Sequence, residues 1–70
     1  MKNYYQHWSK EALMHRKDAL TYDIEQWEKV LENAKSFLIR YSLTYTIKKS
    51  REEIHAINAE LCYREHNNTI

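Results

Sequence analysis

The chain has 70 residues, a formal net charge of +1, and neither glycine nor proline. Without these residue types it lacks the usual means of forming tight turns and positive φ angles, so we expect long helices and very few turns. One cysteine rules out an intramolecular disulfide, and no apolar run approaches the roughly 18 residues that a membrane span needs. The composition predicts a single all-α domain, 1–70, in a cytoplasmic setting without membrane contact.

The chain opens with an aromatic segment, residues 1–9, which has no apolar stretch typical of a signal peptide. Its large aromatic side chains are those of Tyr4, Tyr5 and Trp8. The hydroxyl of Ser9 is suited to cap a helix that begins at residue 10. Trp8 and Leu13 then have the spacing of a hydrophobic staple across this cap.

A long first helix is predicted over residues 10–41. Apolar residues follow one another at alternating spacings of four and three, which is the heptad pattern of a helix that packs along a seam. The seam consists of Leu20, Ile24, Trp27, Leu31, Ala34, Leu38, Tyr41 and Tyr45. Val30 and Phe37 widen this stripe toward the broader apolar face of a helical bundle.

A shorter second helix is predicted over residues 51–66, followed by a tail at 67–70. Its start rests on Ser50 and Glu53, which have the spacing of a capping box. The apolar phase of this helix does not continue the heptad seam, so residues 42–50 are expected to connect the two helices. Residues 41–48 also alternate apolar and polar side chains, which leaves a helix end, a loop or an intermolecular strand as alternatives.

In this hairpin the second helix is too short to cover the N-terminal half of the stripe, and uncovered apolar surface of this size marks an interface. We therefore expect a homodimer or higher oligomer, with the chains packed into a helical bundle. The residues expected to contact a second copy or another protein are Tyr4, Tyr5, Trp8, Leu13, Leu20, Ile24 and Trp27. Blocks of opposite charge along the chain favour antiparallel pairing or present separate charged surfaces to a partner.

A basic block over residues 35–51 offers an alternative partner. It contains Lys35, Arg40, Lys48, Lys49 and Arg51. No acidic residue lies among them, and Phe37, Tyr41 and Tyr45 are interspersed. Basic side chains neutralise phosphates and aromatic rings stack on unpaired bases, so this block predicts nucleic-acid binding as the alternative function.

No catalytic constellation, cofactor motif or metal site is predicted. Cys62 and His66 share one helical face, but they supply two ligands where a structural zinc site needs four. The function expected from the sequence is that of a non-enzymatic helical adaptor or inhibitor that self-associates and binds another macromolecule through its helix faces. In architecture alone, such a hairpin resembles small regulators encoded by plasmids and phages.

Overall fold

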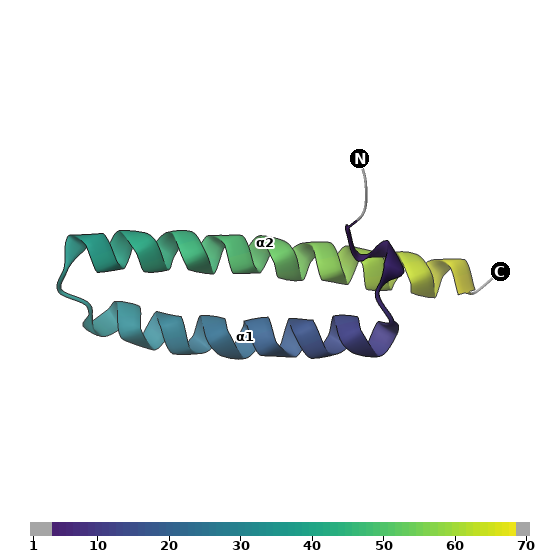
Figure 1. The fold of residues 1–70 in the computed structure, drawn as a ribbon, viewed down its shortest axis with the longest axis horizontal. Helices are drawn as coiled ribbons and strands as arrows, with labels where there is room; N and C mark the ends of the chain where they lie inside the picture. The colour runs from purple at the N-terminus through teal and green to yellow at the C-terminus, as the bar shows by residue number, and fades with distance from the viewer. Residues whose placement is uncertain (1–3, 69–70) are drawn as a thin grey trace.

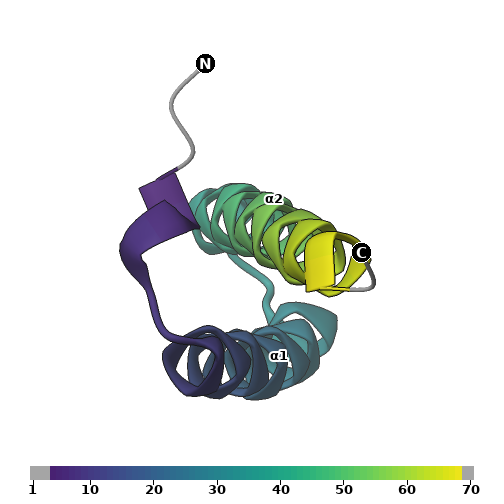
Figure 2. The ribbon, with the colours of Figure 1, turned by 90° about the vertical axis from the view of Figure 1, so that its right-hand side faces the viewer.

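The computed structural model describes residues 4–68, which form an antiparallel hairpin of two packed α-helices (Figure 1). Helix α1 comprises Lys10–Asn33 and helix α2 comprises Phe37–Asn68, with residues 34–36 between them. A 3-10 turn, η1, comprises Tyr4–His7 and leads from the start of α1 across to α2 (Figure 2). The molecule measures 52 × 23 × 16 Å. The predicted all-α helical hairpin is confirmed.

The start of α1 matches the prediction. The Ser9 side-chain oxygen accepts a hydrogen bond from the Ala12 N–H at 3.0 Å, and the Ser9 carbonyl accepts from the Leu13 N–H at 3.0 Å. Ser9 therefore satisfies free donors in the first turn, as an N-cap does. Trp8 packs against the core cluster that contains Leu13, as the hydrophobic staple requires.

The chain reverses between α1 and α2 without a left-handed residue, since none of the described residues has a positive φ. Ala34 leaves the helix with extended backbone angles, φ −76° and ψ 128°, and its N–H still donates to the Leu31 carbonyl. The Ser36 carbonyl accepts from the Arg40 N–H at 3.0 Å, which places Ser36 at the N-cap of α2. Arg40 Nη1 donates to the carbonyls of Leu31 and Ala34, both at 3.3 Å, and so satisfies the exposed end of α1.

The predicted boundaries are wrong in the middle of the chain. The helix expected over 10–41 ends at Asn33, residues 42–50 lie inside α2, and the helix expected over 51–66 is the second half of α2. The first helix is therefore the shorter one, with 24 residues against 32. The heptad spacing misled the prediction because the apolar residues keep their spacings of three and four across the short connection, even though the chain reverses direction there.

Ser50 illustrates why the capping-box interpretation fails. It lies in the interior of α2, where it is buried together with Ile47 and Ile57. These spacings of three and seven place the three residues on one helical face, toward α1, so Ser50 serves as a small packing residue. The alternating segment 41–48 is likewise helical, neither loop nor strand. Of the predicted tail 67–70, residues 67 and 68 belong to α2, and 69–70 lie outside the described residues.

The core lies toward the open end of the hairpin. Leu13 and Leu20 of α1, Ile57 of α2 and Tyr5 of η1 form one buried cluster. Around this cluster pack the partly buried side chains of Trp8, Ile54 and Leu61. The apolar stripe of α1 is therefore covered within one chain, because α2 is long enough to reach its N-terminal half. The expected reason for dimerisation, an uncovered stripe, does not hold.

Candidate functional site

Several large apolar side chains are exposed to solvent at the turn end of the hairpin. We call them the turn-end patch: Val30, Phe37, Leu38, Ile39, Tyr41 and Tyr45. Phe37 and Leu38 are the most exposed, at 77% and 74% of their full surface. All but Val30 come from the first turns of α2, beyond the point where its inner face meets the buried core. A group of large exposed apolar side chains at one end of a molecule is typical of a binding interface.

The aromatic members of the patch have defined neighbours. The rings of Phe37 and Tyr41 stack with centroids 6.5 Å apart and an interplanar angle of 27°. The ammonium of Lys49 lies 5.5 Å from the centroid of the Tyr45 ring, within cation–π range. These one-turn contacts hold the aromatic rings along the surface of α2, where they offer broad contact area at low entropic cost.

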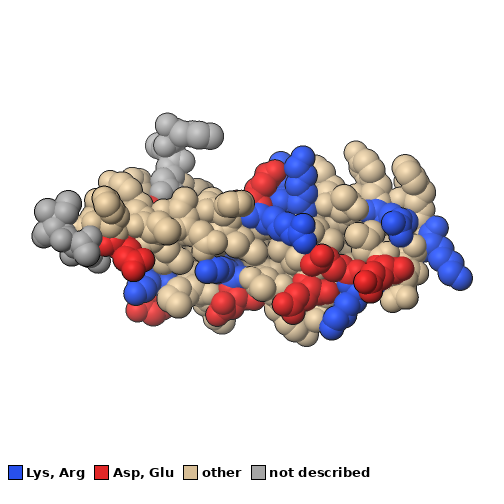
Figure 3. Space-filling view, turned by 180° about the vertical axis from the view of Figure 1, so that it is seen from behind, with Lys and Arg blue, Asp and Glu red and all other residues tan. Residues whose placement is uncertain are grey.

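The basic block does not form one free cationic surface. Arg40 binds the carbonyls at the end of α1, Arg51 pairs with Glu28 at 3.1 Å, and Lys49 lies 3.8 Å from Glu52. Lys35 and Lys48 are exposed beside the turn-end patch. Figure 3 shows uncharged and basic surface on α2 at the turn end, while acidic residues lie along α1 and reach close to the same end.

Most of the residues predicted to form an interface are instead buried or partly buried within the single chain. Leu13, Leu20 and Ile24 are buried between the helices, and Trp27 is partly buried. In the N-terminal cluster, the ring centroids of Tyr4 and Tyr5 lie 5.1 Å apart, and so do those of Tyr5 and Trp8. Tyr5 is buried and Trp8 partly buried, so only Tyr4, at 74% exposure, projects to solvent. The structure brings Tyr5, Leu13 and Leu20 together as core, and places most of the exposed large apolar side chains at the opposite end.

Arg64 fastens η1 to α2. Its Nε donates to the buried carboxylate of Glu60 at 2.6 Å, and one of its terminal nitrogens donates to the backbone carbonyls of Tyr5, Gln6 and Trp8. The three carbonyls are thereby satisfied by a charged donor whose own charge is balanced by Glu60. This arrangement positions the aromatic cluster as a structural element.

A second network joins all three elements at the same end. Arg16 of α1 donates two hydrogen bonds to the Glu53 carboxylate of α2, at 2.7 and 3.2 Å. These hydrogen bonds lower the pKa of Glu53 below its ordinary value. Burial, followed by the hydrogen bond with Glu53, raises the pKa of Tyr5 to about 12. The network stabilises the packing of η1 and contains no group poised to titrate near neutral pH.

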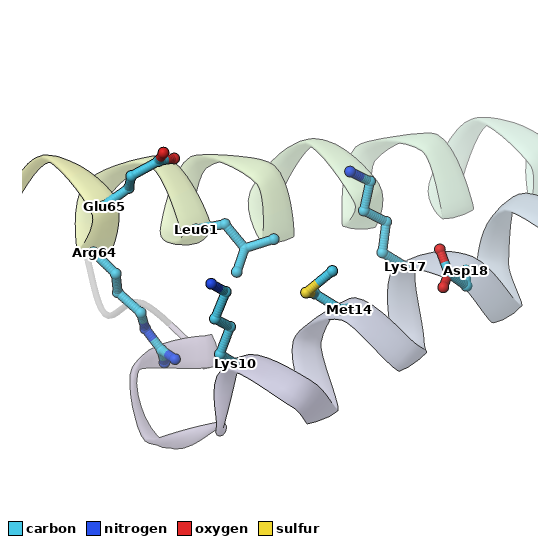
Figure 4. A pocket seen from close by; sticks show the side chains of 7 residues that line it. All are labelled: Lys10, Met14, Lys17, Asp18, Leu61, Arg64 and Glu65. Carbon is cyan, nitrogen blue, oxygen red and sulfur yellow. The ribbon is translucent and has the colours of Figure 1, made fainter.

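A shallow groove of about 350 Å³ lies between the helices near their open end (Figure 4). Met14 and Leu61 form its apolar part, and it is flanked by both acidic and basic side chains. Arg64, one of its basic residues, is committed to η1 and Glu60. Within residues 4–68 no group of three or more His, Cys, Asp or Glu side chains is placed to hold a metal ion, and Cys62 is exposed.

Neither α1 nor α2 carries an apolar stretch long enough to cross a bilayer. Comparisons with family models, with curated proteins and with solved structures found no significant match for this chain. The turn-end patch is thus identified from the chain's own residues. The sequence had placed Leu38, Tyr41 and Tyr45 on the internal seam, and only the position of the turn reveals that they face solvent.

Proposed function

We propose that this chain is a non-enzymatic protein-interaction module that binds through the turn-end patch. The observation that carries the proposal is the separation of two apolar surfaces. One is the buried core at the open end, and the other is the exposed set that includes Phe37, Leu38, Tyr41 and Tyr45. Because α2 already buries Ile47 and Ile57 against α1, the exposed set is not needed to hold the hairpin together.

The chemistry of the patch favours a protein over a nucleic acid as the partner. Tyr and Phe on a helix face, with few fully free charges, resemble the anchors of protein interfaces. Phosphate binding would rely on the basic block, but Arg40 and Arg51 are already engaged within the chain. Nucleic-acid binding through Lys35, Arg40, Lys48, Lys49 and Arg51 is retained as the outcome that would replace the proposal.

Photo-crosslinking tests the proposal. A photoreactive benzoylphenylalanine is placed at Tyr41, inside the patch, or at Tyr22, a tyrosine of similar exposure on α1 (68% against 60%). In the cells from which the chain comes, irradiation is expected to give protein adducts from position 41 and none from position 22. Equal adducts from both positions, none from either, or adducts that a nuclease removes would overturn the proposal.

A further inference from the structure

The outer face of α2 carries a stripe that extends well beyond the turn-end patch. Exposed residues follow one another at spacings of three and four along nearly the whole helix, so they lie on one side of it. We call them the outer stripe: Leu38, Tyr41, Tyr45, Lys49, Glu52, Ala56, Ala59 and Tyr63. At about 100° per residue, the outer stripe lies opposite the face that buries Ile47, Ser50 and Ile57 against α1.

The outer stripe has two complementary halves. Its N-terminal half carries large apolar side chains, whereas its C-terminal half carries Ala56 and Ala59 before ending at Tyr63. A basic and an acidic residue, Lys49 and Glu52, stand at the centre. Rotating the helix by 180° about an axis between residues 50 and 51 exchanges Lys49 with Glu52 and Tyr45 with Ala56. The stripe thus matches its own reversed copy, as an isologous interface requires.

We propose that a second copy of this chain binds the outer stripe in antiparallel orientation, about a twofold axis that runs between the two α2 helices at the level of residues 50 and 51. Tyr45 then packs over the partner's Ala56, Leu38 meets the partner's Tyr63, and Lys49 faces the partner's Glu52. This inference rests on the proposed function, because it names the protein that the exposed surface binds.

Charge selects the antiparallel orientation. Residues 33–51 contain five Lys and Arg and no Asp or Glu, whereas residues 52–65 contain four Glu and one Arg. Parallel pairing or tip-to-tip pairing would bring two basic segments together, and like charges in contact oppose association. Antiparallel pairing places each basic segment opposite an acidic one. The pair of Lys49 and Glu52 within one chain, 3.8 Å apart, becomes part of a four-membered network at the twofold axis.

The available area is sufficient for a weak dimer. Leu38, Tyr41, Tyr45 and Tyr63 are each more than half exposed, and each can bury roughly 100 Å². Counted over two copies, these side chains supply on the order of 800 Å². The small and charged residues between them bring the total to about the 1,000 Å² that a specific interface needs. An interface of this size belongs to the weak, transient class, so the dimer is expected to dissociate on dilution.

The composition of the outer stripe also favours a second copy of the chain over other binding partners. A bilayer surface or a nucleic acid would use the apolar and basic residues near the turn, such as Leu38 and Lys35, and would gain nothing from Glu52 or Tyr63. A second copy uses both halves equally, and the central pair has opposite signs. Reversing the sign of Lys49 or Glu52 therefore tests the second copy specifically.

The experiment is sedimentation equilibrium of the full chain from about 1 to 500 μM, the range in which small interfaces dissociate. The variants are Lys49→Glu, Glu52→Lys and the double exchange, with Lys29→Glu on α1 as a control that has the same charge change as Lys49→Glu. Far-UV circular dichroism checks that each variant keeps its helices. Because each exposed central pair occurs twice in the dimer, either single reversal is expected to weaken dimerisation about tenfold. The double exchange should restore it, and the control should leave it unchanged.

Three results would overturn the inference. The first is a wild-type chain that stays monomeric over the whole concentration range. The second is a dimer that neither charge reversal weakens, and the third is a dimer that both reversals weaken but the double exchange does not restore. The monomeric chain is also titrated with phosphatidylglycerol vesicles and with duplex DNA, and binding to either identifies a different occupant. A monomer that still crosslinks from position 41 to another protein refutes the second copy and leaves the proposed function intact.

Discussion

Replacing Leu13 with alanine tests whether the N-terminal half of the apolar stripe of α1 is buried within one chain. In the hairpin described above it is buried, whereas a shorter second helix would leave it uncovered. Leu13 has 0% exposure and belongs to the cluster with Leu20, Ile57 and Tyr5. Truncating a fully buried leucine removes its transfer free energy and leaves a cavity, which together cost about 2–5 kcal/mol. A chain of this length has a free energy of unfolding of only about 4–10 kcal/mol. Leu13→Ala is therefore expected to remove a large fraction of the stability, or all of it.

The neighbouring methionine provides the matched control. Met14 lies on the same helix at 49% exposure, so Met14→Ala is expected to cost less than about 1 kcal/mol. Urea unfolding of both variants, followed by circular dichroism at concentrations low enough to keep the chain monomeric, measures the difference. Equal stabilities for the two variants, or a loss for Leu13→Ala that disappears at low concentration, would refute burial of Leu13 within one chain.

Three further predictions concern the polar contacts. Because the folded state lowers the pKa of Glu53, the stability from its pairing with Arg16 is present above the unfolded pKa, about 4.5, and is lost as the pH falls through the folded value. The free energy of unfolding of Glu53→Gln should thus fall less steeply with decreasing pH, and at pH 7 it should be about 1 kcal/mol lower than that of the wild type. An unchanged pH dependence in the acid range would contradict the pairing. Because the pKa of Tyr5 is raised to about 12, the stability from its neutral hydroxyl is present below pH 10 and is lost between about 10 and 12. Tyr5→Phe should remove this alkaline loss, and spectrophotometric titration that finds every tyrosine ionising near pH 10 would exclude the contact. Arg40→Met removes the donor to the carbonyls of Leu31 and Ala34 and should cost about 1 kcal/mol, with faster exchange of the Ala34 N–H, which donates to Leu31, than in the wild type. Unchanged exchange there would show that Arg40 does not hold this helix end.

Much of the fold could be predicted from local patterns. The absence of glycine and proline, the cap at Ser9 and the apolar spacing from Leu13 to Leu31 predicted an all-α hairpin with a helix that begins at residue 10, and the structure agrees. These signals are local because capping and amphipathic spacing depend on residues within one or two turns.

The position of the turn could not be predicted in the same way. Ser36 and Ser50 are both suitable helix caps, and only Ser50 has an acidic residue three positions later. The choice between them is made by packing between distant residues. A turn at 34–36 lets Ile57 reach Leu13 and lets Arg64 reach η1, which a turn at 42–50 does not. The candidate site followed from this choice, because the same side chains form an inner seam for one turn position and an exposed patch for the other.

Distance measurement between spin labels on Cys62 tests the central claim, that the outer face of α2 binds a second copy, most directly. Cys62 is the one cysteine of the chain and is exposed, so each copy carries one label without further substitution. It lies about 17 Å along α2 from the proposed twofold axis, and the antiparallel dimer therefore predicts a single distance of about 35 Å. A distance below about 20 Å, as parallel helices would give, or no dipolar coupling at concentrations where the chain sediments as a dimer would contradict it.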